Sequence, residues 1–450
     1  MDTKKLTDSL DDRLFSDKIF KKVYVFYAFW LVVSPVVETI CQTVGLKFIV
    51  MFQIMLIATL FAITKFFELI FNFRNINIKN KTIIDLLLVC LFVWFLISSA
   101  VNSAFNVNFF LGICYFLCFV LFVSIDKRFY KTLAIVFVCE MVFNTILGLI
   151  DLENNIVPGF EENEFEMSMQ FRNPNWAGFV VIIAEILCLW FIYDSEKSLQ
   201  KASYFLAFIV LTIGLFVGGS FAPEMSFYLC ELALLIYLWI KNKKCPWLIL
   251  SAFLTSIFIS FAVWFVPVFR RVSTANANFF YETLAMIDGK LGTNLVEGVS
   301  TFFDKLFGWG VMTEVPGSDG WGRGDLNAQA YKAIFASAKS FIFGYGSAYI
   351  YTIRVHNCFL VMWLEFGIVG ILLFLAIIAM LLVRFVKIKK TDCIVFLFSA
   401  LVMLLFDSLF CCIEPYCFPF FVIFSAIIYK QLYSKELKEA KQKQEILSQK

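Results

Sequence analysis

The chain has 450 residues, of which 61% are hydrophobic and 16% are charged, and its mean hydropathy is +0.82. A sequence with so few polar residues excludes a soluble protein of this size and indicates an integral membrane protein. The net charge of +3 is nearly balanced, so the composition gives no reason to expect a nucleic-acid partner.

The chain starts with a polar segment and continues as a series of apolar stretches. Residues 1–22 lack the apolar core and small-residue cleavage site of a signal peptide, so we expect a retained cytoplasmic segment. About twelve of the later stretches are long enough to cross a hydrocarbon layer of about 30 Å. The predicted transmembrane helices are 23–43, 47–70, 83–101, 107–125, 131–150, 175–193, 204–222, 225–240, 247–268, 357–383, 393–410 and 415–432. The sequence therefore predicts an all-α polytopic membrane protein.

Lysine and arginine gather in alternate connections between these stretches. They occur before the first helix, near residues 74–81, 127–131, 197–201, 241–244 and 387–390, and from 430 to the end of the chain. By the positive-inside rule, both termini and the tail 433–450 are predicted to be cytoplasmic. This alternation supports the division into helices 1–9 within 23–268 and helices 10–12 within 356–432.

The connection over residues 269–355 is too long for a simple turn and is predicted to be a large, mostly helical domain on the outer face. Residues 276–286 and 326–341 have helical patterns, 308–324 is rich in glycine, and Gly344-Tyr345-Gly346 predicts a tight turn.

Two motifs begin predicted helices on the outer face. In Arg172-Asn173-Pro174-Asn175, Asn173 suits an N-cap and Pro174 the first helical position. The other motif is His356-Asn357, and His356 is the only histidine of the chain. Helix N-termini with arginines beside them attract phosphate or pyrophosphate, and imidazole can move a proton near neutral pH. Taken alone, His356 could equally be an interfacial residue that caps a helix.

Gly344-Tyr345-Gly346, His356-Asn357-Cys358-Phe359-Leu360 and Glu365-Phe366-Gly367-Ile368-Val369-Gly370 resemble the signature of the O-antigen ligase and Wzy-type polysaccharide polymerase family. The segment Phe171-Arg172-Asn173-Pro174-Asn175 is similar to an asparagine-proline-asparagine segment of that family. The resemblance implies a metal-independent membrane glycosyltransferase without cofactors. Such an enzyme moves a glycan from a polyprenyl-pyrophosphate carrier to a glycan or lipid acceptor on the outer face of the bacterial cytoplasmic membrane.

The resemblance also implies roles for single residues. His356 would be the base that activates the acceptor, and Arg172 would bind the pyrophosphate, while Asn173, Asn175, Asn357 and Glu365 would support the site. General phosphate chemistry adds further candidates for the pyrophosphate, namely Arg270, Arg271, Arg323 and Arg354. The family's usual arginine after the seventh helix is absent from residues 219–224, and Asn327 stands where another is common, so Arg323 could substitute for the latter.

Several alternatives stay open. Polymerase, ligase and protein-glycosylating relatives share these motifs, and we favour the polymerase. The acids within the predicted helices would suit a transporter or flippase of lipid-linked sugars, although no second copy of the long loop is present. They are Asp85, Glu140, Glu185, Glu231 and Asp407.

The sequence also raises the questions of a metal site and of disulfides. The glutamates of 153–166 could bind a cation but are more typical of a solvated segment, and the first outer connection offers only Glu38. Most cysteines lie in apolar stretches, where they act as small hydrophobic residues, whereas Cys411, Cys412 and Cys417 could pair.

For Glu365, an unbroken helix would place it about 180° around and about 13 Å along from His356, which predicts a packing role rather than direct contact with the imidazole. In the same helix, Gly367 and Gly370 predict the close approach of another helix.

Overall fold

The computed structural model describes residues 17–44, 46, 49–71, 83–125, 129–151, 174–218, 221–243, 245–265, 323–346 and 358–387. These residues form helices and short connections and contain no strand. The predicted helices 393–410 and 415–432, the segment 276–286 and the three cysteines from 411 to 417 lie outside the described residues.

Ten helices correspond to predicted transmembrane stretches. They are α2 (Asp17–Thr43), α3 (Val50–Phe71), α4 (Ile83–Val101), α5 (Val107–Ser124), α6 (Tyr130–Asp151), α7 (Pro174–Asp194), α8 (Ser198–Val217), α9 (Phe221–Asn242), α10 (Trp247–Phe265) and α15 (Cys358–Lys387). Two shorter helices, α13 (Arg323–Ile334) and α14 (Ala338–Phe343), precede α15.

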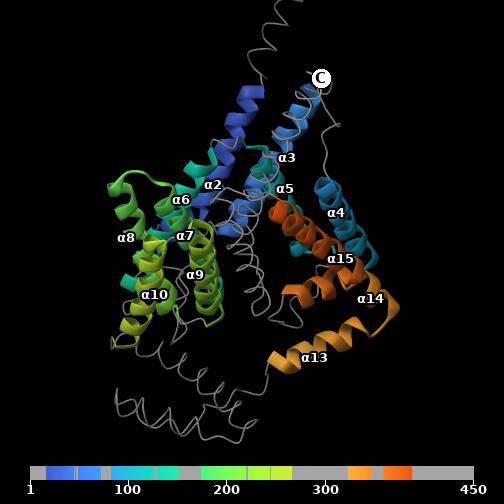
Figure 1. Ribbon diagram of the computed structural model, residues 1–450. Coiled ribbons are helices and arrows are strands. Elements are labelled where there is room, and N and C mark those ends of the chain that lie inside the picture. Colours follow the sequence, from blue (N-terminus) through green and yellow to red (C-terminus); the bar gives the residue numbers. More distant parts are fainter. Residues whose placement is uncertain are drawn as a thin grey trace, which may run out of the picture.

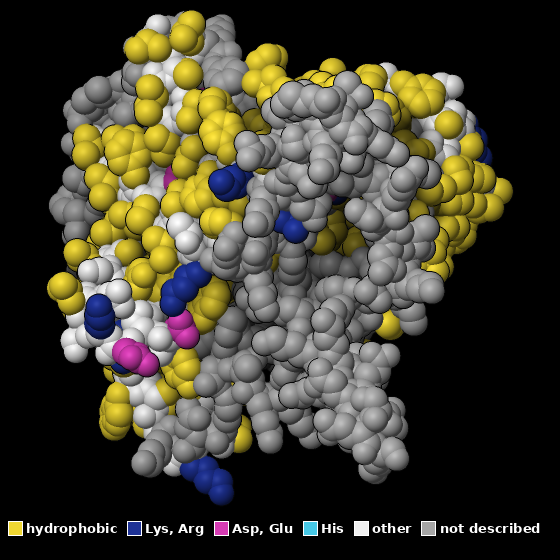
Figure 2. Space-filling view, turned by 90° about the horizontal axis from the view of Figure 1, so that it is seen from above, with side chains coloured by type: hydrophobic (Ala, Val, Ile, Leu, Met, Phe, Trp, Pro, Cys, Tyr) yellow, Lys and Arg dark blue, Asp and Glu magenta, His cyan; other side chains and the backbone are white. Residues whose placement is uncertain are grey.

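Length and composition make this a polytopic membrane protein. Within the described residues, eight helices are long and apolar enough to cross a membrane, and α4 and α10 carry the shorter apolar segments Leu86–Val101 and Trp247–Val263. Hydrophobic side chains cover most of the described surface in Figure 2, and charged side chains are few. Lipid is the solvent that such a surface requires. The prediction of an all-α membrane protein is thereby confirmed.

Local chemistry moves some boundaries away from the predicted ones. Helix α2 begins at Asp17, inside the predicted polar segment. Helix α8 ends at Val217 with Gly218 as its C-cap, whose N–H donates to the Gly214 carbonyl at 2.9 Å, and α9 starts at Phe221. The segment 326–341, which was predicted to be helical, forms two helices, α13 and α14, with the second one capped by Ser337.

The break between α13 and α14 has a specific cause. The Ser337 side chain accepts from the Ser340 backbone N–H, and the Ser340 side chain accepts from the Ser337 N–H. This reciprocal capping box is a strong signal for a helix N-terminus, and here it begins a new helix within an otherwise continuous helical pattern.

The helices form two outer groups with a third group between them. Figure 1 shows α6 to α10 on one side, α4 with α13, α14 and α15 on the other, and α2, α3 and α5 between them. One continuous apolar core is formed by α2, α3, α5, α6, α7, α8, α9 and α10. Stacked rings link α4 to α5, with Phe92 and Phe116 at 4.1 Å and Phe95 and Phe109 at 5.4 Å between centroids.

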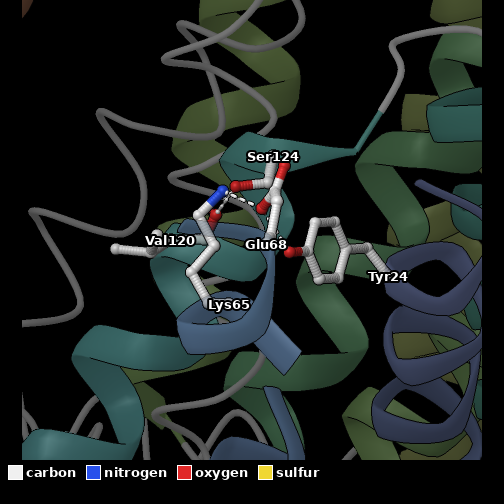
Figure 3. Close-up of polar contacts among 5 residues, drawn as sticks. All are labelled: Tyr24, Lys65, Glu68, Val120 and Ser124. Carbon is white, nitrogen blue, oxygen red and sulfur yellow. Dashed lines mark hydrogen bonds and ion pairs between the residues drawn. The ribbon is translucent and has the colours of Figure 1, made fainter. Parts of the chain in front are cut away.

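Polar groups inside the central helices are paired. Glu68 of α3 accepts from the Tyr24 hydroxyl of α2 and from the Lys65 ammonium, each at 2.5 Å, and Ser124 of α5 lies beside them and donates to the Val120 carbonyl (Figure 3). Because each charge has a partner, this cluster lowers the cost of holding a carboxylate among apolar helices.

From the sequence, Glu38 was assigned to the first outer connection, but the structure places it elsewhere. It lies within α2, is buried, and accepts the backbone N–H of Val50 at 2.6 Å. Val50 is the first residue of α3, so the carboxylate caps the N-terminus of that helix, where the helix dipole favours a negative charge.

Candidate functional site

Helix α15 is broken at Gly367, in the middle of the second signature motif. Gly367 has φ 65° and ψ −172°, a backbone conformation that essentially only glycine adopts. A helix cannot continue its hydrogen-bond ladder through such a residue. The carbonyls just before it therefore need other partners, because an unpaired carbonyl among apolar helices is costly.

The turn Gly344-Tyr345-Gly346 supplies two of these partners. The Tyr345 N–H donates to the Leu364 carbonyl at 2.8 Å, and the Gly346 N–H donates to the Glu365 carbonyl at 2.9 Å. The two signature segments, about twenty residues apart in the sequence, are thus joined backbone to backbone. The predicted tight turn at 344–346 is confirmed, and its function in the fold is to complete α15.

Helix α4 and the residue that follows it complete the arrangement with three side chains at a spacing of four residues. The Trp94 ring N–H donates to the Phe366 carbonyl at 2.7 Å. Ser98 donates to the carbonyls of Phe343 (2.6 Å) and Glu365 (3.0 Å), and Asn102 donates to the Gly344 carbonyl at 3.1 Å. We call the turn 344–346, residues 364–367, and Trp94, Ser98 and Asn102 the glycine interlock.

Side chains larger than glycine do not fit at two positions of the interlock. A Cβ atom at Gly344, which has φ 68°, would lie 2.5 Å from the backbone of Glu365. A Cβ atom at Gly367 would overlap the Ile342 carbonyl and lie 2.7 Å from the Gly344 nitrogen. Both obstacles are backbone atoms, which cannot rotate away, so these glycines are required for the close approach.

Gly367 and Gly370 were predicted to allow the close approach of another helix, and the structure shows which segments approach them. The backbone that approaches Gly367 is the end of α14, and Gly370 faces Trp94 of α4, with 3.4 Å between a Cβ atom at Gly370 and the ring.

A small apolar core holds α13 and α14 against the first turns of α15. Its buried residues are Ala330, Ile334, Leu360, Val361 and Leu364. The Tyr345 hydroxyl donates to the Ala333 carbonyl at 2.8 Å, so the central residue of the turn also fixes α13. Figure 1 shows α13 lying across the lower end of the bundle, next to α14.

The segment that contains His356 is bordered by Gly346 of the interlock and by Cys358 of α15. The chain leaves the interlock at Gly346, beside Glu365, and re-enters the described structure at Cys358, the first residue of α15. Cys358 and Glu365 are seven residues apart on one helix, or about 10 Å. His356, Asn357 and Arg354 belong to the eleven residues between Gly346 and Cys358 and lie outside the described residues.

Glu365 is the one predicted site residue whose side chain is described. It is 6% exposed, and its Oε1 atom has no hydrogen-bond partner among the described residues. The predicted helical spacing between His356 and Glu365 stays a prediction, because His356 lies outside the described residues.

The first motif also directly precedes a helix. Helix α7 begins at Pro174, as predicted, so Asn173 is the residue before its first turn and Asn175 lies within it. Gly178 packs against the start of α9, since a Cβ atom there would lie 2.8 Å from the Pro223 ring. Arg172 and Asn173 lie outside the described residues.

The described residues do not join the two motif helices in one pocket. The principal neighbours of α7 are α6, α8, α9 and α10, and those of α15 are α4, α13 and α14. Of the predicted arginines, Arg323 begins α13, whereas Arg270 and Arg271 lie outside the described residues, as do the glutamates of 153–166. Across the described residues, no group of three His, Cys, Asp or Glu residues could hold a metal ion.

Sequence reasoning missed the contribution of α4. A signal was present, because Trp94 and Ser98 of α4 and Asn102 directly after it recur every fourth residue, a spacing that places side chains on one side of a helix. Comparison of the chain with protein-family models, with curated proteins and with solved structures found no match.

Proposed function

We propose that this protein is a bacterial membrane glycosyltransferase of the O-antigen ligase and Wzy-type polymerase kind. It acts as a polymerase, transferring glycan repeat units from a polyprenyl-pyrophosphate carrier to a lipid-linked acceptor on the outer face of the cytoplasmic membrane. Transfer to lipid A core, as by a ligase, or to a protein is the alternative within the same chemistry.

The glycine interlock is the observation that carries this proposal. It joins Gly344-Tyr345-Gly346 to Glu365-Phe366-Gly367, two of the segments on which the family resemblance rests. Gly346 of the interlock and Cys358 of α15 border the segment that contains His356. A catalytic base needs rigid support, because small displacements of the base greatly reduce the rate.

The reaction divides between two kinds of side chain. The acceptor hydroxyl oxygen attacks the anomeric carbon of the donor, and the bond from that carbon to the pyrophosphate oxygen breaks. His356 takes the proton of the attacking hydroxyl. The pyrophosphate leaves with its negative charge, which arginine side chains can receive without a proton transfer.

Arg172 is the first candidate for the pyrophosphate, because it stands two residues before the start of α7, where unpaired N–H groups favour an anion. Arg354 lies in the segment that contains His356. Arg323 lies one helical turn before Asn327 on α13, which supports its substitution for the arginine that the family places near that position. Arg270 and Arg271 remain candidates by residue type alone.

The helix order supports a common side for the two motifs. If every predicted helix crosses the membrane, α7 and α15 are the sixth and tenth crossings, so both begin on the same face. Together with the basic residues of the alternate connections, this order favours cytoplasmic termini and an outer segment 269–355.

Reconstitution with defined substrates tests the function. Purified protein in liposomes receives a polyprenyl-pyrophosphate-linked glycan and, in separate reactions, no further acceptor, lipid A core or a pilin-like protein. The proposal expects lipid-linked chains that grow by whole repeat units in the first reaction, without an ion gradient.

Leu372→Ala serves as a matched control, because Leu372 lies on α15 but is exposed to lipid, and this variant should keep full turnover. Product only with lipid A core or protein would replace the polymerase by its alternative. Transport of the donor across the membrane without glycan transfer would make the protein a flippase.

A further inference from the structure

A layer of buried polar side chains crosses the middle of the α6 to α10 group. Glu140 is the eleventh of the 22 residues of α6, and Glu231 is the eleventh of the 22 residues of α9. Glu185 is the twelfth of 21 in α7, and Ser256 is the tenth of 19 in α10. Each lies about 15 Å from the ends of its helix, which is the depth of the bilayer centre.

Glu185 and Glu231 form the centre of this layer. Glu185 has no exposed surface and Glu231 is 1% exposed. The two carboxyl groups are near enough for their charges to interact, and α7 packs directly against α9. Two like charges at such a depth oppose each other, so this pair cannot be fully ionised without a compensating cation.

Neither group has the partners that would compensate a charge. Both carboxyl oxygens of Glu185 and the Oε2 atom of Glu231 lack a hydrogen-bond partner among the described residues. Ser256 donates to the Oε1 atom of Glu231 at 3.2 Å and shares the same hydroxyl with the Ala252 carbonyl. Thr212 of α8 lies beside Glu185, but its hydroxyl donates to the Phe208 carbonyl at 2.8 Å.

The titratable groups around the pair are acidic or neutral. Cys188 lies on the same helix as Glu185 and interacts electrostatically with it and with Cys139 of α6. Tyr228 of α9 interacts with Glu185, Glu231 and Glu224. From α6, Glu140 accepts a hydrogen bond from Asn144. No described lysine or arginine pairs with either carboxyl. Lys131 of α6 forms an ion pair, at 2.7 Å, with Asp194, the last residue of α7.

We propose that Glu185 and Glu231 form a binding site at the membrane centre for an exchangeable proton. The proton resides on one of the two carboxyls, whose charges interact across the contact between α7 and α9. With one proton bound, the pair carries one negative charge instead of two. The Thr212 oxygen, whose own proton is donated to the Phe208 carbonyl, lies beside Glu185 as an acceptor for this proton. This site is independent of the glycosyl-transfer chemistry assigned to His356.

Infrared spectroscopy of the purified protein tests the proposal directly. The wild-type protein should show the carbonyl stretch of a protonated carboxyl group at neutral pH, and this band should shift in D₂O as the proton exchanges. Glu185→Gln and Glu231→Gln should each remove or displace it. Glu68→Gln is the matched control, because Glu68 is paired with Lys65 and should contribute no such band.

Several results would overturn the proposal. If neither glutamine variant changes the protonated-carboxyl signal between mildly acidic and mildly alkaline pH, the pair does not hold the proton. A band that never shifts in D₂O means that the proton is trapped and not exchangeable. Loss of the band when choline chloride is replaced by sodium chloride at constant pH assigns the site to a metal cation instead. Glutamine is neutral and similar in shape, and either variant alone is sufficient for the test.

Discussion

The glycine interlock and the Glu185–Glu231 pair treat buried polar groups in opposite ways. In the interlock, each of the backbone carbonyls of Phe343, Gly344, Leu364, Glu365 and Phe366 accepts at least one hydrogen bond from another element. At the acid pair, three carboxyl oxygens on adjoining helices have no such partner. Both regions lie within a membrane protein, where water is not at hand to complete a missing bond.

This difference indicates that the interlock supports the fold, whereas the acid pair is a binding site. Fully bonded polar groups hold elements in one arrangement, and the interlock does this for α14, the turn and α15. Incompletely bonded polar groups have spare capacity for a ligand, and at Glu185 and Glu231 the ligand we infer is a proton. Glu365 belongs to both categories, because its backbone is bonded in the interlock while one of its side-chain oxygens is not.

The strongest way to break the interlock is Gly367→Ala. A methyl group there overlaps the Ile342 carbonyl, and the backbone conformation alone costs about 1–3 kcal/mol for a residue other than glycine. We expect the turn to separate from α15, with faster hydrogen exchange over residues 338–346 and glycan transfer reduced at least about tenfold.

Gly112→Ala is the matched control for this variant. Its Cβ atom would meet only the tip of the Phe95 ring, at 2.7 Å, and the backbone at Gly112 is helical. If Gly367→Ala exchanges and turns over like Gly112→Ala, the interlock does not position the site.

A milder disruption removes single donors of α4. Ser98→Ala leaves the buried Phe343 carbonyl without its hydroxyl donor, and Trp94→Phe does the same to Phe366. Each should lower the free energy of unfolding by about 1–3 kcal/mol, measured by thermal unfolding in detergent. Ser251→Ala, which removes an exposed hydroxyl of α10, should change it by less than about 0.5 kcal/mol. An equal decrease in the free energy of unfolding in all three variants would show that the hydrogen bonds donated by Trp94 and Ser98 do not contribute more to stability than an exposed one.

Glutamine at the acid pair should have a smaller effect. If Glu185 is neutral when the pair holds its proton, Glu185→Gln exchanges one neutral group for another and should change the free energy of unfolding by less than about 1 kcal/mol. The melting temperature in detergent measures this change. A much larger loss would indicate that the negative charge itself is needed in the fold.

Chelation should have the smallest effect of all. Arginines can stabilise the leaving pyrophosphate as a metal ion would, so we expect glycan transfer to continue unchanged in EDTA. Rates measured with and without EDTA check this. Activity that disappears and returns with magnesium or manganese would contradict it and would draw attention to the glutamates of residues 161–166.

The sequence predicted the helices well, because apolar length is a local property. The stretch 131–150 corresponds to α6 at Tyr130–Asp151, and 107–125 corresponds to α5 at Val107–Ser124. Errors arose where a short polar pattern competes with the hydrophobic one. The Ser337 capping box divides the helical pattern over 326–341 into two helices, and α8 ends at Val217, before the predicted residue 222.

The site was harder to predict because its bonds join distant parts of the chain. Nothing local to Gly367 shows that its positive φ is matched by a turn twenty residues earlier, and a glycine in an apolar helix is equally compatible with an unbroken helix. The donors of α4 are separated from their acceptors by about 240 to 270 residues. Likewise, neither Glu185 nor Glu231 indicates from its own neighbours which helix it faces.

The most direct test of the proposed chemistry is the turnover of His356→Gln beside His356→Ala and the wild type, in liposomes with a polyprenyl-pyrophosphate-linked glycan. Glutamine retains hydrogen bonding but cannot act as a base, and a positioned base contributes about 10²–10⁴-fold to the rate. We therefore predict that both variants fold and bind the donor but lose transfer to a similar extent. Near-wild-type turnover in either variant would contradict the catalytic assignment and leave His356 as an interfacial helix cap.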